Sequence, residues 1–376
     1  MKYFEKEVAT PPENYVRVDH VSLREFVREI FIKTGVKPEY SSIVADVLVT
    51  ADLMGISSHG VRSIRRYVEG IRSKSIEPNN EPVVVSDIGA ITLIDGMNGL
   101  GQVISIKALD YLFEKIKYYG IGLVGVRRSN HFGPAGYYSL KIVEKGFIGI
   151  SMSNSRPLVA YINTVEKNIG TNPLAIGLPR RKPPPILYDA ATSIVPIGRI
   201  EYYSIIGREI PLGWVVDSKG EYLSGNPVEI LNKIVKGDAS LIPLGGLSEE
   251  TGGHKGSGLA LIIDILSGVL TGANWGKNVG YSVGDKPANV GHLFIGIDID
   301  CFMDREVFYD RLEKYIEELK SSRKRNGCDN IWIPGEKSWY TMMTRLEIGI
   351  PLHKNVYNEL LSIGRELGVK TNLVIK

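Results

Sequence analysis

His131 is the residue of this chain with the strongest local case for acid/base chemistry. It lies in SNHFGPAGYYS, residues 129–139, between an asparagine and a phenylalanine. Imidazole titrates near neutral pH and is the commonest general base in enzymes. The stretch follows a predicted strand and precedes a predicted helix, at the end of a strand where open α/β sheets bind ligands. Ser129 and Asn130 are expected to orient the ring. The same turn could equally use the ring as a structural cap, so local features leave both roles open.

Three further histidines lie beside glycines, which allow tight turns and close approach of a ligand. They are His59 in SSHGV, His254 in GGHKG and His292 in VGHLF. His292 opens a predicted strand, and we expect it to be structural. His254 precedes Lys255 at the start of an apolar helix. There the helix dipole favours an anion and lowers the proton affinity of the lysine.

The chain lacks the short motifs of several familiar catalytic sites. Its one match to G-x-G-x-x-G, GIGLVG at 120–125, leads into a predicted strand rather than out of one. DGMNGLGQV at 95–103 opens a helix with glycines, and an ordinary turn is favoured there over a phosphate site. Neither a P-loop nor a G-x-S-x-G elbow is present. Without H-E-x-x-H spacing, and with only Cys301 and Cys328, no metal site is expected.

Composition excludes several classes of protein. A chain of 376 residues favours two domains, and a net charge of +3 with dispersed basic residues argues against nucleic acid as a partner. The charged N-terminus does not resemble a signal peptide. The most apolar stretch, 259–270, is interrupted by Asp264 and is too short to span a bilayer. We therefore expect a soluble, cytoplasmic protein without a membrane partner.

The elements that must position these residues follow from the hydrophobic periodicity. Helices are predicted over 22–35, where Ser22 and Glu25 form a capping box, and over 38–55 and 61–74. From about residue 83 to 155 the order is β-α-β-α-β. Further strands are predicted at 173–179, 213–220 and 292–300, and further helices at 254–273, 304–325 and 355–369.

This order predicts an α/β fold in three segments. Residues 1–82 form the helical N-terminal part of a substrate and dimerisation domain. Residues 83–250 form a central α/β cofactor-binding domain with a mixed sheet covered by helices. Residues 251–376 supply a helical active-site segment, a returning strand and C-terminal helices. The two terminal parts are expected to form one mainly helical, discontinuous domain.

Several stretches together resemble the type-2 malate/L-lactate dehydrogenase family, which includes sulfolactate and ureidoglycolate dehydrogenases and piperideine-2-carboxylate reductases. They occur in the family's order and include DLMGISSHGVRSIRRYVEGI, IDGMNGLGQV, SNHFGPAGYYSLKIVEKGFIGISMSNS, GTNPLAIGLP, YDAATSIVPIGRI and GGHKGSGLALIIDILSGVLTGA. The resemblance implies a homodimeric oxidoreductase that uses NAD or NADP in a non-Rossmann domain.

The resemblance also implies roles for particular residues. His131 falls on the family's acid/base and Lys255 on its active-site lysine, which we also expect near the cofactor. The substrate-site positions are Ser58 and His59, with Tyr67 nearby. The positions that contact the dinucleotide are Ser155, Asp189, Ala190 and Ala191.

The sequence departs from the family pattern where a substrate carboxylate would bind. Family members usually carry an arginine five residues after the serine of S-H-G, and here that position is Ser63. Because an arginine fork clamps carboxylates well, Arg62 or Arg65 is expected to substitute. His254 is a second departure, since an aromatic residue is common there. Both departures concern the substrate rather than the reaction type.

We therefore predict a dehydrogenase of 2-hydroxy acids, with malate and oxaloacetate as the leading pair and His131 as acid/base. The alternatives are a sulfolactate dehydrogenase or a cyclic imino acid reductase with the same machinery. A catalytically silent nucleotide-binding sensor is a third. The choice between NAD and NADP stays open, because Arg180, Arg181 or Lys182 could favour the 2′-phosphate only if one of them lies near the ribose.

Overall fold

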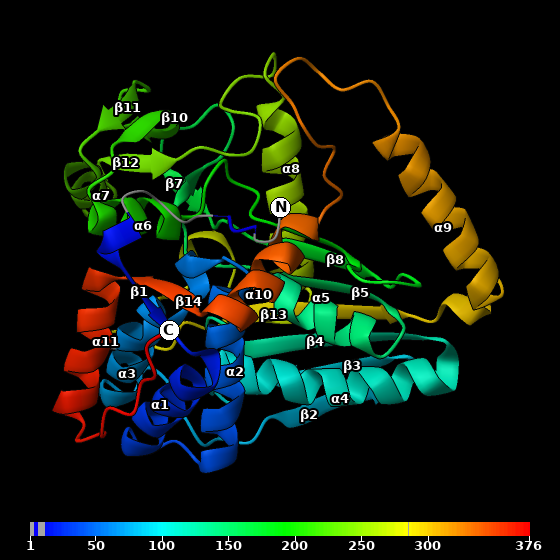
Figure 1. Cartoon of the computed structure of the whole chain (residues 1–376), viewed down its shortest axis with the longest axis horizontal. Helices are drawn as coiled ribbons and strands as arrows, with labels where there is room; N and C mark the ends of the chain where they lie inside the picture. The colour runs from blue at the N-terminus through cyan, green and yellow to red at the C-terminus, as the bar shows by residue number, and fades with distance from the viewer. Residues whose placement is uncertain (1–3, 7–11, 285) are drawn as a thin grey trace.

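The computed structural model describes residues 4–6, 12–284 and 286–376. Helices and strands alternate around three sheets (Figure 1). The helices are α1 His20–Lys33, α2 Pro38–Leu53, α3 Ile64–Arg72, α4 Gly101–Tyr119, α5 Ala135–Glu144, α6 Ile197–Ile206, α7 Pro227–Lys236, α8 Gly253–Asp264, α9 Arg305–Lys320, α10 Glu336–Ile348 and α11 Lys354–Glu366. The strands are β1 Tyr15–Val18, β2 Val83–Ile88, β3 Ile91–Asp95, β4 Ile121–Ser129, β5 Ile148–Ser153, β6 Val159–Ala160, β7 Lys167–Ile169, β8 Leu174–Leu178, β9 Ile186–Ala190, β10 Ile210–Asp217, β11 Tyr222–Gly225, β12 Ala239–Leu241, β13 Val290–Ile297 and β14 Ile350–His353.

The largest sheet has seven strands in the order β2-β3-β4-β13-β5-β8-β9. The predicted β-α-β-α-β elements are present as β3, α4, β4, α5 and β5. Strand β13 lies between β4 and β5 and is antiparallel to both. Strands β3 and β4 are parallel to each other, so the sheet is mixed. The buried apolar faces of α4 and α5 pack on this sheet, with Leu112, Tyr138 and Phe294 in one cluster. The mixed α/β class predicted from sequence is confirmed.

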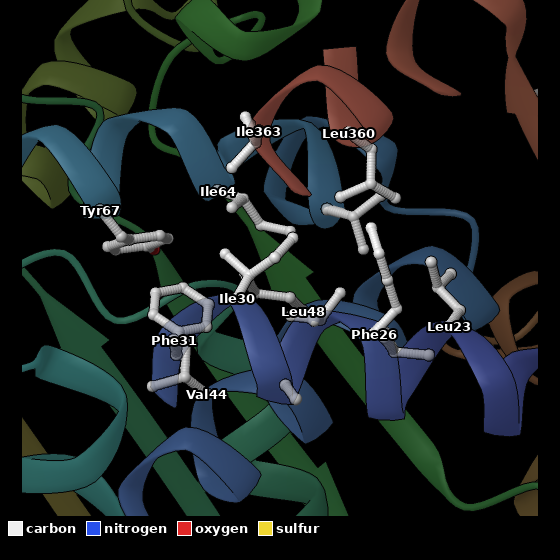
Figure 2. Packing of buried hydrophobic residues seen from close by; sticks show 14 of the residues in the cluster. Leu23, Phe26, Ile30, Phe31, Val44, Leu48, Ile64, Tyr67, Leu360 and Ile363 are labelled. Atoms are coloured by element: carbon white, nitrogen blue, oxygen red, sulfur yellow. The ribbon is translucent and has the colours of Figure 1, made fainter. Parts of the chain in front are cut away.

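Helices from the two ends of the chain share one core. Figure 2 shows Phe26 and Phe31 of α1, Leu48 of α2, Tyr67 of α3 and Leu360 of α11 in a single buried cluster. These helices form because apolar residues recur at helical spacing along each of them. Strand β1 pairs antiparallel with β14, which joins the two ends again.

The start of α1 differs from the predicted capping box at Ser22. Asp19 caps the helix, and its Oδ1 accepts hydrogen bonds from the backbone N–H groups of Val21 and Ser22 at 3.0 Å each. Ser22 lies in the first turn and donates to the Asp19 carbonyl. A carboxylate three residues earlier satisfies two free N–H groups and also suits the helix dipole.

A smaller sheet has the order β11-β10-β12-β6-β7 and packs against α6 and α7. The sequence pattern missed α6, α7 and α10, which are short or lack a clean apolar stripe. Helix α8 continues as a π-helical turn over Ile265–Val269. In the part of the chain that the structure describes, no helix is long and apolar enough to cross a membrane.

The segment 251–376 contributes to more than one part of the fold. Its strand β13 lies in the middle of the seven-stranded sheet, whereas α11 packs on the N-terminal helices. Helix α9 lies at the far edge of the molecule from α1, α3 and α11 (Figure 1). The sequence predicted a strand here, but its pairing with strands more than 130 residues earlier leaves no local signal. The domain boundaries stay a prediction.

Candidate active site

A cavity lies where the terminal helices, the loops after β4 and β5, and α6 meet. It is lined by Ser58, His59, Arg62, Arg66, His131, Phe132, Gly133, Ser153, Asn154, Ser155, Arg156, Leu158, Thr171, Pro173, Pro196, Ile197, Gly198, Glu201, Gly280, Tyr281, Ser282 and Val290. Of the sequence-predicted site residues, it brings together His131, Ser58, His59, Arg62 and Ser155. Concave sites with a few convergent polar groups are the usual binding sites of small molecules.

The buried His292 holds the loop that carries His131 in place. Its Nδ1 lies 2.9 Å from Ser153 Oγ and its Nε2 lies 2.8 Å from Ser129 Oγ, so that it joins the ends of β4 and β5 across β13. The His292 ring also stacks on Phe132, with ring centres 4.4 Å apart. Burial lowers the pKa of His292 to about 3. His292 is therefore a neutral ring with a structural role.

Asn130 and Gly133 shape the rest of this loop. Asn130 Nδ2 donates to the carbonyl oxygens of Asn98 and Gly99, which ties the loop to the turn before α4. The glycine-rich stretch 95–103 is therefore a turn that holds the loop. Gly133 has φ +86°, and a Cβ there would lie 2.8 Å from a methyl group of Val47. Only glycine suits that position without strain.

The side chain that orients the His131 ring is Tyr67, rather than Ser129 or Asn130. Tyr67 Oη lies 2.6 Å from His131 Nδ1, and Tyr67 is fully buried in the core shared by the terminal helices (Figure 2). Burial raises the pKa of Tyr67 to about 12, so that the hydroxyl stays protonated. Because Tyr67 engages Nδ1, Nε2 is the nitrogen that remains for a ligand. Tyr67 does not line the cavity, and we assign it to positioning rather than to substrate contact.

His59 lies parallel to His131, with ring centres 5.5 Å apart and an interplanar angle of 15°. Its Nδ1 lies 2.8 Å from Ser58 Oγ. Burial and the nearby Arg66 lower the pKa of His59 to about 4. The same two causes, in the same order, hold the pKa of His131 well below its usual value. Both rings are therefore neutral near pH 7.

Arg66 is the guanidinium next to the His131 ring, and sequence reasoning did not single it out. Its Nη2 lies 3.4 Å from His131 Nδ1, and its buried Nε has no hydrogen-bond partner among the described residues. Arg62, one helical turn earlier, pairs with Glu201 of α6. The spacing of four residues between two arginines was a usable signal, because residues i and i+4 share a helix face.

Arg65 points away from the cavity, which corrects its assignment to the substrate. Its guanidinium forms ion pairs with Glu359 at 2.7 Å and Glu366 at 2.8 Å on α11. Neighbouring residues on a helix face different directions, so Arg65 and Arg66 cannot serve the same site. Ser63 is buried at the junction into α3 and does not line the cavity.

Lys255 lies outside both hollows that adjoin His131 in the described chain. It is exposed on the first turn of α8. The resemblance placed it in the active site, and this monomer does not bring it to the other predicted residues. Arg180 and Arg181 are likewise engaged elsewhere, in ion pairs with Glu313 and Glu306 of α9.

A second hollow adjoins the cavity and contains three more of the residues predicted to contact a dinucleotide. The two share Ser58, His59, Gly133, Thr171, Pro173 and Pro196. Asp189, Ala190 and Ala191 line the second hollow, with Pro134 and Ala135 at the start of α5. Burial raises the pKa of Asp189 to about 6, and the backbone N–H of Gly136 opposes this shift.

These residues suit a nicotinamide dinucleotide. Lys6 and Arg199 both line the second hollow and provide positive charge for a pyrophosphate. A Cβ on Gly136 would lie 2.6 Å from Asp189 Oδ2, so the helix approaches the carboxylate as closely as glycine allows. Ser155 accepts a hydrogen bond from the Thr171 N–H at 3.0 Å on the cavity wall. The larger hollow therefore combines positive charge with a helix N-terminus, and it opens beside the cavity at His131.

Comparison with known proteins finds similar sequences and a similar structure among dehydrogenases. A sequence family described as malate/L-lactate dehydrogenase matches residues 18–361. A malate dehydrogenase of Pyrococcus abyssi is 48% identical over 95% of this chain and 97% of its own. A malate/(S)-sulfolactate dehydrogenase of Methanothermus fervidus is 34% identical over 92% and 97%. The structure of a malate dehydrogenase from Pyrococcus horikoshii is similar with a TM-score of 0.87, at 43% identity and with 98% and 99% of the two chains covered.

Proposed function

We propose that this chain, which belongs to the malate/L-lactate dehydrogenase family, transfers hydride between NAD or NADP and a 2-hydroxy or 2-oxo acid, with malate and oxaloacetate as the leading pair. Its membership makes it an oxidoreductase of malate/lactate dehydrogenase type that acts on a hydroxy acid. The observation that carries the finer proposal is the neutral His131 ring, held by Tyr67 and flanked by Arg66 in one cavity.

In the oxidation direction, His131 Nε2 takes the proton of the substrate hydroxyl. For Nε2 to act as the base, Nδ1 must carry the ring proton and donate it to the Tyr67 hydroxyl, which lies 2.6 Å away. Arg66 pairs with the substrate carboxylate and turns C2 toward the neighbouring hollow. A bound oxidised nicotinamide supplies the acceptor for the hydride of C2. In reduction, the protonated His131 returns the proton to the developing alkoxide.

The seven-stranded sheet supports a cofactor domain that is not of the Rossmann type. A Rossmann sheet is mostly parallel, with a phosphate-binding turn between a strand and the next helix. Here β13 separates β4 from β5 and is antiparallel to both. The hollow that suits the dinucleotide lies beside α5 and β9 instead.

Substrate identity is tested by the absorbance of NADH and NADPH with oxaloacetate, sulfopyruvate, pyruvate and piperideine-2-carboxylate. We expect the fastest oxidation of the cofactor with oxaloacetate. Sulfopyruvate is the main alternative because of the relative named a malate/(S)-sulfolactate dehydrogenase. A preference for the cyclic imine would instead indicate an imino acid reductase. Tight cofactor binding without turnover of any compound would overturn the proposal in favour of a nucleotide sensor.

Tyr67→Phe is expected to lower kcat about tenfold or more while KM changes less than about threefold, because the ring loses its orienting hydrogen bond but keeps its substrate partners. Steady-state kinetics in both directions check this split. Tyr137→Phe is the matched control, since it removes another buried hydroxyl, bonded to Asp46 at 2.6 Å, away from the cavity. If both variants lose the same activity, Tyr67 contributes only to stability.

We also propose a homodimer. Helix α8 and its π-helical extension expose a run of large apolar side chains, which include Leu261, Ile262, Ile265, Val269 and Leu270. Such a patch on a soluble chain usually marks an association surface. Light scattering is expected to give twice the chain mass of 41.5 kDa, and Ile262→Glu is expected to give a monomer. A wild-type protein that is monomeric at micromolar concentration would contradict this.

A further inference from the structure

We propose that Arg156 binds a second anionic group of the substrate, so that the cavity selects 2-oxo and 2-hydroxy acids with two negative charges. This rests on the function proposed above, in which the carboxylate beside the reacting carbon pairs with Arg66. A distal carboxylate and a distal sulfonate share the chemistry that Arg156 would recognise, because both are acceptor-only anions of suitable shape for a guanidinium.

Arg156 lies in the loop after β5 and lines the cavity together with His131. Its guanidinium lies over the ring of Tyr281, 4.1 Å from the ring centre. A cation–π contact fixes the plane of the guanidinium but leaves its N–H groups unused. Among the described residues, no carboxylate lies within ion-pair distance of Arg156. A guanidinium on a cavity wall with unused donors can bind an anionic acceptor there.

The base of Arg156 is rigid. Asn154, two residues before Arg156, is buried and donates from Nδ2 to Asp264 Oδ1 at 2.9 Å and to the Asn274 carbonyl at 2.6 Å. Its Oδ1 accepts from the Gly291 N–H at 2.9 Å. All the hydrogen-bonding groups of this side chain are therefore used. The start of the loop is preorganised, which lowers the entropic cost of holding Arg156 over the cavity.

The charges that line the cavity are unbalanced. Three guanidiniums, those of Arg62, Arg66 and Arg156, face one carboxylate, that of Glu201. Arg62 forms the ion pair with Glu201. Because His59 and His131 are neutral, an excess of two positive charges remains, on Arg66 and Arg156.

The positive charge of Arg66 opposes the positive charge of Arg156. Burial lowers the pKa of Arg156 and the positive charge of Arg66 lowers it further, against the opposing effects of Tyr281 and Glu201. A ligand with two anionic groups gives each guanidinium an acceptor and removes this repulsion. A monocarboxylate leaves one guanidinium unpaired in a partly buried site, which costs binding energy.

Arg156→Gln tests the assignment through the ratio of kcat/KM for oxaloacetate to kcat/KM for pyruvate, in which a general loss of activity cancels. We expect this ratio to fall about 10- to 100-fold, the usual effect of a lost charge-assisted hydrogen bond. The ratio of kcat/KM for sulfopyruvate to kcat/KM for pyruvate, measured in the same way, distinguishes a distal sulfonate from a distal carboxylate. Arg156→Lys is expected to restore part of the ratio, and Arg208→Gln, which removes an exposed guanidinium over the Tyr203 ring, is expected to leave it unchanged. An unchanged ratio in Arg156→Gln would overturn the inference while leaving the proposed function intact.

A binding measurement separates this inference from the proposed function. Malonate, a dianion, and acetate, a monoanion, are compared for thermal stabilisation of the wild-type and Arg156→Gln proteins at equal ionic strength. We expect malonate to raise Tm more than acetate does in the wild type only. If no 2-oxo acid is reduced but this difference is lost in the variant, the proposed function fails and the dianion site stands. A malonate effect that persists in Arg156→Gln would refute the site whatever the activity.

Discussion

His131→Asn is expected to lower turnover by roughly 10²–10⁴-fold, the usual contribution of general acid/base catalysis. Asparagine retains polar atoms near Tyr67 but cannot exchange a proton near neutral pH. Since Arg66 and the second hollow are unchanged, KM for the acid and the affinity for the nicotinamide cofactor should change little. Steady-state kinetics and the fluorescence of bound NADH measure these three quantities.

His254→Asn is the matched control for this variant. His254 is exposed on the first turn of α8 and does not line either hollow at His131. It should retain wild-type turnover. Near-normal turnover of His131→Asn would remove His131 from the acid/base role and would favour the structural-cap interpretation of its turn.

Arg66→Gln is expected to lower kcat/KM for oxaloacetate by roughly 10²-fold, because it removes a buried, charged partner of the substrate carboxylate. Most of this loss should come from a higher KM for oxaloacetate rather than from a lower kcat. The control is Arg65→Gln next to it, which breaks only the exposed ion pairs with Glu359 and Glu366. Exposed pairs of this kind contribute about 0–1 kcal/mol, so the control should keep both its activity and its Tm. Equal losses in the two variants would contradict the assignment of Arg66.

Arg66→Gln should also change the pH profile of kcat/KM for hydroxy acid oxidation. His131 acts as a base there and must be neutral, and both burial and Arg66 hold its pKa well below its usual value. The wild type should therefore keep its kcat/KM as the pH falls through 6.5. Removal of the positive charge at Arg66 raises the pKa of His131, so that the acidic limb moves to higher pH. If the acidic limb of this pH profile stays in place or moves to lower pH in Arg66→Gln, Arg66 does not act on the pKa of His131.

Local signals in the sequence predicted much of the frame around this site. The apolar spacing in 22–35 and 38–55 placed α1 and α2, and the strand-turn-helix pattern around His131 placed its loop between β4 and α5. These features depend on residues only a few positions apart, so periodicity and turn chemistry capture them. The resemblance to a family added the role of His131, which the local pattern had left open.

The composition of the charged cluster was not predictable in this way. The pair Arg62 and Arg66 comes from one segment, whereas His131, Arg156 and Glu201 come from three others. Nothing in the spacing of one segment reports the others. The choice between Arg65 and Arg66 depends on where the 3₁₀ turn Val61–Ser63 ends and α3 begins, since one residue rotates a side chain by about 100°. The first residue of a helix is harder to predict from sequence than the presence of the helix.

The sequence by itself determined which chemistry the chain carries: a histidine in a turn between a strand and a helix, arginines for an anion, and glycines where the backbone must turn tightly. The tertiary structure alone decided which of these groups meet. It placed β13 between β4 and β5 and buried Tyr67 so that its hydroxyl reaches His131. It also paired Arg62 with Glu201 and left Arg66 and Arg156 on the cavity wall without an ion pair to a described carboxylate. The physical reason is that electrostatic and hydrogen-bond energies depend on distances of a few ångströms, which long-range packing sets and local sequence does not encode.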